Sequence, residues 1–191
     1  MASADPIRRV SVLSTGTVVI HPEQAAVTWK PTYQWLFTSR RWTQPLPVNA
    51  YVIEHRDGLV LFDTGQDRAS VIRPSDYYPG GLAGLLYRRL ARFDIGPPTR
   101  SAPSSPPSAI NRTGRVPLLL VGDLTYDAHL LEHGHVPGVG ARRQLRETTA
   151  MVNALRHRHP GMVILAAHDP GASARLASAT GEPAQASTGG G

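Results

Sequence analysis

The stretch that decides the fold is Val116-Pro-Leu-Leu-Leu-Val-Gly-Asp-Leu-Thr-Tyr126, an apolar run that leads directly into a carboxylate. A short apolar run bounded by turn residues is typical of a strand that is buried on both faces. Asp123 follows this run, which places its carboxylate at the rim of a sheet, where α/β folds gather their ligands. The same residue could also serve only as a cap for the segment that follows.

Two further apolar runs end in the same way. Residues 59–62 lead into Asp63-Thr-Gly, and residues 162–167 lead into His168-Asp-Pro. We therefore expect Asp63, Asp123 and His168 to converge at one edge of a sheet. Carboxylate oxygens and imidazole nitrogens are suitable zinc ligands. The sequence has no cysteine, which excludes disulfides and thiolate ligands.

Residues 48–65 predict a β-hairpin, because Asp57-Gly58 is a strong turn signal between two β-rich runs. The Asp63-Thr-Gly sequence at its end also resembles half of an aspartic protease site. That class needs a second acid of the same kind, which the chain lacks, so we set this interpretation aside.

The remaining segments have simpler patterns. Residues 7–20 predict one or two edge strands, and residues 80–93 and 142–157 predict amphipathic helices. Residues 24–46 predict an irregular segment that contains most of the bulky aromatic side chains. These aromatic side chains either line an apolar substrate pocket or pack the segment onto the body of the protein.

Three histidines follow the Asp123 strand within seven residues, at His129, His133 and His135. His129 and His133 are four residues apart and would share one face of a helix. The three side chains could act as substitute metal ligands, or they could form a solvated turn that ends at Gly134.

The length of 191 residues suits one domain with a real core, and the net charge is +6. Lys30 is the single lysine, and the arginines occur as scattered pairs without interleaved aromatic residues, which disfavours a nucleic-acid partner. We expect neither a membrane span nor a secretory signal, and hence a cytoplasmic protein. Residues 1–172 predict a single domain with a Pro/Ser-rich interruption at residues 97–111, and residues 173–191 predict a flexible tail.

Several motifs together resemble one family. Ala50-Tyr-Val-Ile-Glu-His55, followed by Gly58-Leu-Val-Leu-Phe-Asp-Thr-Gly-Gln66, resembles the opening hairpin of metallo-β-lactamase-fold hydrolases. The likeness is greatest to the quorum-quenching N-acyl homoserine lactone lactonases. Gly122-Asp123 with Tyr126, and Ala167-His-Asp-Pro170, resemble later motifs of the same branch.

The resemblance implies an α/β fold, namely an αβ/βα sandwich with a two-zinc site at the sheet edges. Asp123 would be the carboxylate that bridges the metals, and His168 would bind the second metal. Tyr126 would be the catalytic tyrosine that contacts the substrate carbonyl, and Asp63 a buried acid that orients neighbouring ligands. The implied cofactor is zinc, the implied substrate is a small lactone or ester, and a homodimer is left open.

The chain lacks two motifs of this family. The signature His-x-His-x-Asp-His after the first long helix is missing, as is a later zinc-binding histidine in a Pro-Gly-His context. The Pro/Ser-rich segment stands in their place. An internal deletion, a shifted reading frame or a faulty gene model would each produce this pattern. We therefore expect an incomplete fold and impaired or lost hydrolysis. The alternative is a non-catalytic remnant or binding module of the same fold.

Overall fold

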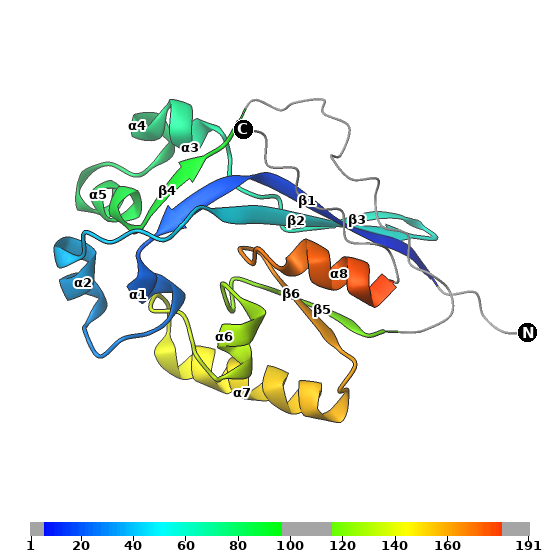
Figure 1. Cartoon of the computed structure of the whole chain (residues 1–191). Coiled ribbons are helices and arrows are strands. Elements are labelled where there is room, and N and C mark those ends of the chain that lie inside the picture. Colours follow the sequence, from blue (N-terminus) through cyan, green and yellow to red (C-terminus); the bar gives the residue numbers. More distant parts are fainter. Residues whose placement is uncertain (1–5, 97–115, 181–191) are drawn as a thin grey trace, which may run out of the picture.

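The computed structural model describes residues 6–96 and 116–180 (Figure 1). Their strands form a four-stranded antiparallel sheet in the order β3-β2-β1-β4 and a two-stranded parallel sheet of β5 and β6. The strands are β1 (Ile7–Ile20), β2 (Leu46–His55), β3 (Gly58–Phe62), β4 (Ala91–Asp94), β5 (Leu118–Gly122) and β6 (Val163–Ala166). The helices are α1 (Pro22–Ala25), α2 (Thr32–Thr38), α3 (Ala69–Ile72), α4 (Pro74–Tyr77), α5 (Gly81–Leu90), α6 (Ala128–Glu132), α7 (Arg142–Arg158) and α8 (Ala172–Thr180).

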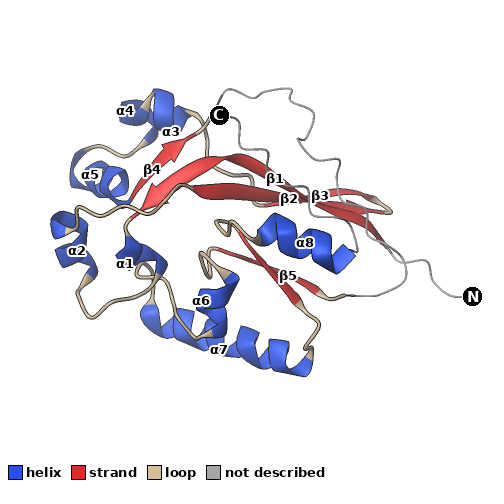
Figure 2. Cartoon of the chain, in the orientation of Figure 1, coloured by secondary structure: helices blue, strands red, loops and turns tan. Residues whose placement is uncertain are grey.

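Helices flank the two sheets. Figure 2 shows α6 and α7 on the outer side of β5 and β6, whereas α3 to α5 lie beside β4 at the far end of the larger sheet. None of the helices in the described ranges combines the length and apolarity that a membrane crossing requires. The predicted Pro/Ser-rich interruption at residues 97–111 lies outside the described residues.

The predicted hairpin is confirmed, since β2 and β3 pair antiparallel with His55 opposite Gly58. The prediction of an edge strand at residues 7–20 is confirmed in part. β4 pairs with β1 only at residues 17–20, so within the described chain residues 8–16 lie at the edge of the larger sheet and the last four residues lie between β2 and β4. The strand is anchored by its apolar side chains, since Val10, Val18 and Ile20 are buried in the core.

The helix predicted over residues 80–93 ends at Leu90, and residues 91–94 form β4 instead. Thr17 of β1 pairs with Asp94, and Val18 pairs with Phe93. Phe93 fits the spacing of the helical stripe, but it packs against the buried cluster around Val18. Pairing with β1 thus overrides the helical pattern in the last turn.

The segment predicted to be irregular, residues 24–46, contains the end of α1 and all of α2. Trp35 on α2 is 1% exposed and packs into the body, whereas Trp29 is 83% exposed. Trp42 likewise contacts the ring of buried His21, so packing onto the body is observed for part of this aromatic set, and the substrate pocket stays a prediction.

The predicted flexible tail is wrong for residues 173–180, because α8 forms there. Ala172 and Leu176 of this helix are buried in one cluster with Val10, Tyr51 and Leu165. The small alanine side chains let the helix approach the sheets closely, so a composition that resembles a frayed end packs well here. Residues 181–191 lie outside the described residues.

Tyr51 joins the two sheets. It is fully buried on β2, and its hydroxyl donates to the carbonyl oxygen of Ala166 on β6 at 2.7 Å. Burial, together with the carboxylate of Asp169, raises the pKa of Tyr51.

Tyr51→Phe is expected to change how stability depends on pH. The folded state keeps the Tyr51 proton that the unfolded chain releases above pH ~10, so stability falls as the pH rises past that value. The variant lacks this loss, although at neutral pH it is less stable by about 1–2 kcal/mol because the Ala166 carbonyl loses its donor. Urea unfolding of both proteins near pH 8 and above pH 10 measures the difference. Equal losses in the two proteins would contradict it.

Candidate functional site

The ends of β5 and β6 bring two predicted site residues together. The strands run parallel, with Leu120 paired to Leu165, so their carboxyl ends lie at the same edge. Asp123 follows β5 and His168 follows β6, and the Nε2 atom of His168 is 3.3 Å from Oδ1 of Asp123. The structure therefore places these two side chains in contact, as the sequence pattern predicted.

The His168 ring is held from both sides. Its Nδ1 atom is 3.0 Å from the carbonyl oxygen of Pro47, and a ring nitrogen that faces a carbonyl must carry a proton to bond to it. Its side chain is 14% exposed, whereas that of Asp123 is 73% exposed. The orientation of the ring is thus fixed by β2, and its other nitrogen points to the carboxylate.

Opposing effects act on the protonation of this pair. Burial lowers the pKa of His168, but the Asp123 carboxylate and the Pro47 carbonyl outweigh burial and raise it above the usual value. The bond from His168 in turn holds the pKa of Asp123 below its usual range. Both changes favour the charged forms, an imidazolium on His168 and a carboxylate on Asp123.

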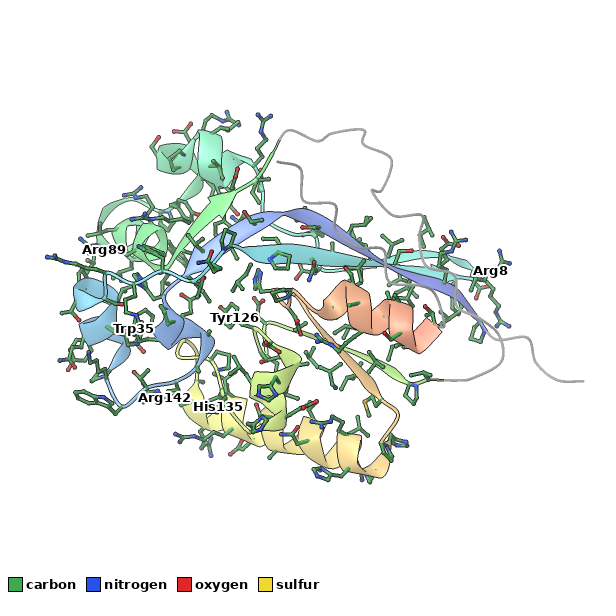
Figure 3. The ribbon with its side chains drawn as sticks, viewed as in Figure 1. Arg8, Trp35, Arg89, Tyr126, His135 and Arg142 are labelled. Carbon is green, nitrogen blue, oxygen red and sulfur yellow. The ribbon has the colours of Figure 1, made fainter. Side chains whose placement is uncertain are left out.

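Tyr126 lies against this pair on the segment between β5 and α6, and it is labelled in Figure 3. Its ring stacks on that of His168, with the centroids 5.5 Å apart and the planes 17° from parallel. The Tyr126 hydroxyl accepts a hydrogen bond from Nε2 of Gln24 on α1 at 2.9 Å. Burial raises the pKa of Tyr126, so the hydroxyl keeps its proton.

The expectation for Asp63 needs a correction. β3 does end near β5, because a side chain on Gly122 would meet the Phe62 ring at 3.9 Å. Asp63 itself is exposed, has a φ of 65°, and accepts a hydrogen bond from the Gly65 amide at 2.9 Å. Its carboxylate thus stabilises its own turn and is exposed, where a buried acid was expected, although its charge still helps to raise the pKa of His168.

The three histidines lie apart from the pair. His129 and His133 have ring centroids 4.2 Å apart, and Nδ1 of His133 lies 2.9 Å from the His129 carbonyl oxygen. All three, including His135, are exposed around α6. In the described part of the chain, no three His, Asp or Glu side chains are grouped so that they could hold a metal. His129 thus lies on α6, whereas His133 and His135 lie in the exposed turn that follows it, and a role as substitute ligands stays a prediction.

The contact pair fits a zinc ion only in part. Two donors of one tetrahedral zinc lie about 3.4 Å apart, close to the 3.3 Å between Asp123 and His168. A metal-binding histidine usually gives its other ring N–H to a carbonyl, as His168 does to Pro47. A catalytic zinc, however, takes about three protein ligands besides water, and the described residues supply two. The donor set does not fit a resident catalytic zinc.

Asp169 is a residue of this region that the sequence interpretation missed. It is 2% exposed, and its carboxylate accepts hydrogen bonds from the amides of Ala128 at 2.9 Å and Gly171 at 2.7 Å. It also contacts the guanidinium of Arg175 on α8. Asp169 thus fixes the loop of His168 to α6 and α8. In the sequence, only its position next to His168 indicated that Asp169 could belong to the site.

No protein-family model matches the sequence, and no curated protein matches it. Solved structures do match the fold. An N-acyl homoserine lactone hydrolase with N-hexanoyl-L-homoserine at its catalytic metal center is 14% identical, with a TM-score of 0.52 over 87% of this chain and 95% of that chain. The B. thuringiensis AiiA mutant with N-decanoyl-L-homoserine at its active site gives the same identity, TM-score and coverage.

A third structure comes from work on how indirect contributions of mutations optimize a new enzyme function. It is 12% identical, with a TM-score of 0.59 over 88% of this chain and 95% of that chain. At these identities the likeness concerns the fold. The chain has the metallo-β-lactamase fold that is shared by the N-acyl homoserine lactone hydrolases.

Proposed function

We propose that this protein is a lactonase-type hydrolase by descent whose hydrolytic activity is strongly impaired or lost. The observation that supports this is the contact between Asp123 and His168 without a third donor in the described residues. The likeness to lactone hydrolases suggests a small lactone or ester as the ligand of this site. The missing His-x-His-x-Asp-His signature agrees with the incomplete donor set.

The three site residues are arranged to bind rather than to activate water. Both nitrogens of His168 face acceptors, so the ring offers no free lone pair as a general base. The lowered pKa of Asp123 makes its carboxylate a weak base. Tyr126 accepts from Gln24 and keeps its own proton, which it can donate to the carbonyl oxygen of a ligand.

Hydrolysis of N-hexanoyl homoserine lactone tests this proposal. We expect ring opening close to the uncatalysed rate, with and without added zinc, because no group in the site activates water. The control is His168→Ala, which should behave like the natural chain. A turnover of about 1 s⁻¹ or more that is lost in His168→Ala would overturn the proposal, since this is the usual range for enzymes.

A second candidate function is binding of a lactone without hydrolysis, favoured by the free proton of Tyr126 beside the exposed carboxylate of Asp123. NMR titration with the same lactone measures this. We expect shifts at His168 and Tyr126, with binding about 5- to 10-fold weaker in Tyr126→Phe, the equivalent of one hydrogen bond. Equal binding by the natural chain and the variant would place the ligand elsewhere.

A further inference from the structure

One face of α7 is left uncovered. Thr149 is buried, and Asn153 donates to the carbonyl oxygen of Leu131 at 2.8 Å, so this side of the helix faces the body of the protein. The opposite side is exposed and presents residues spaced by four, three and four positions, which places them in one line along the helix. This stripe consists of Glu147, Met151, Ala154 and Arg158.

The centre of the stripe is apolar. Met151 is 69% exposed, and Ala154 beside it on the stripe is also exposed. A groove of about 320 Å³ runs along the flank of the stripe, between α7 and Leu119 of β5. Its lining is formed by Leu119, Met151, Val152, Ala154, Leu155 and Arg158. Apolar surface thus continues from the stripe toward the smaller sheet.

The ends of the stripe carry opposite charges. Glu147 lies toward the beginning of α7, and Arg158 is its last residue. The contact from Glu147 to Arg143 in the same helix is 3.9 Å long and highly exposed, so it contributes little. Across residues 6–96 and 116–180, no carboxylate forms an ion pair with Arg158, whereas Arg156 pairs with Glu132.

We propose that two copies of this chain associate through the stripe, with their α7 helices antiparallel about a two-fold axis. The axis passes between Met151 and Ala154, because positions 147 and 158 are equally distant from that point, at about 8 Å along the helix. Glu147 of each copy then faces Arg158 of the other, and Met151 packs beside Ala154 of the other copy and along the groove.

Charge complementarity favours a second copy over another partner. A two-fold contact is self-complementary, so the acid at one end and the base at the other are both neutralised by the same surface. A parallel arrangement would bring like charges together, and a uniformly acidic or basic partner would neutralise only one end. The inference is independent of the proposed function, because none of the stripe residues belongs to the site of Asp123 and His168.

The association is expected to be weak. A single helix pair buries less than the roughly 1,600 Å² of a standard interface, so we expect a dissociation constant on the order of 10 μM. The exposed ion pairs are screened by salt, and the association should weaken as the ionic strength rises.

Charge reversal tests the proposal with the full chain in sedimentation equilibrium between about 1 and 200 μM. The natural chain should form dimers. Glu147→Arg and Arg158→Glu should each weaken the dimer at least ~10-fold, because like charges then meet, and the double variant should restore it to within about 3-fold. Arg146→Glu is the matched control: it reverses an exposed charge about 100° around the helix from Glu147 and should leave the dimer unchanged.

Circular dichroism and thermal unfolding establish that each variant is folded, as expected for exposed positions. A natural chain that stays monomeric at the highest concentration would overturn the proposal. So would single reversals without effect, a double variant that does not recover, or an assembly larger than a dimer.

Discussion

Asp169→Ala is expected to lower the free energy of unfolding by about 3–5 kcal/mol. The carboxylate is buried and accepts from the amides of Ala128 and Gly171. Its removal leaves both amides without an acceptor and leaves Arg175 beside a void instead of a counter-charge. Because small domains have a total stability of about 5–15 kcal/mol, a loss of this size should leave much of the variant unfolded at 37 °C.

The control is Asp127→Ala. Asp127 directly precedes Ala128, whose amide donates to Asp169. Asp127 caps α6 by accepting from the His129 amide at 2.8 Å, and this bond is exposed. Loss of such a cap costs about 1 kcal/mol. Urea unfolding monitored by circular dichroism compares the two variants. Equal losses would show that Asp169 is no more than a local cap.

Leu165→Ala is expected to cost about 3–5 kcal/mol, the second large effect. Leu165 on β6 is fully buried in the cluster that joins the larger sheet, the smaller sheet and α8. Truncation removes apolar contacts and leaves a cavity where these three parts meet, and the rigid β6 strand cannot collapse into it.

Leu59→Ala on β3 makes the same chemical change at a position that is 74% exposed. It should change stability by less than about 0.5 kcal/mol. Thermal unfolding of both variants measures the contrast. A loss at Leu165 as small as that at Leu59 would mean that the two sheets do not share one core.

The sequence predicts the parts of this fold that depend on local patterns. Asp57-Gly58 is a strong signal for the hairpin, and continuous apolar runs mark β5 and β6. Prediction from the sequence fails where contacts between distant segments determine the secondary structure. Pairing with β1 stabilises residues 91–94 as a strand. Packing against the core stabilises the alanine-rich residues 172–180 as a helix. No local rule contains those contacts.

In the candidate site, too, some residues could be predicted from the sequence and others are shown only by the fold. Asp123 and His168 could be predicted because each directly follows an apolar run in the sequence, and the structure places both runs in one sheet. Gln24, whose amide holds the Tyr126 hydroxyl, lies 102 residues away in the sequence, so only the fold shows its part. The position of Asp63 was predicted, but not that its carboxylate bonds within its own turn.

The amount of zinc per chain tests the central claim most directly. The protein is equilibrated with zinc, dialysed against zinc-free buffer and measured by elemental analysis, with His168→Ala alongside. We predict zinc well below one ion per chain in both proteins, because two protein donors hold the metal too weakly. One or two ions per natural chain that are lost in His168→Ala would contradict the account and show that the metal site is complete.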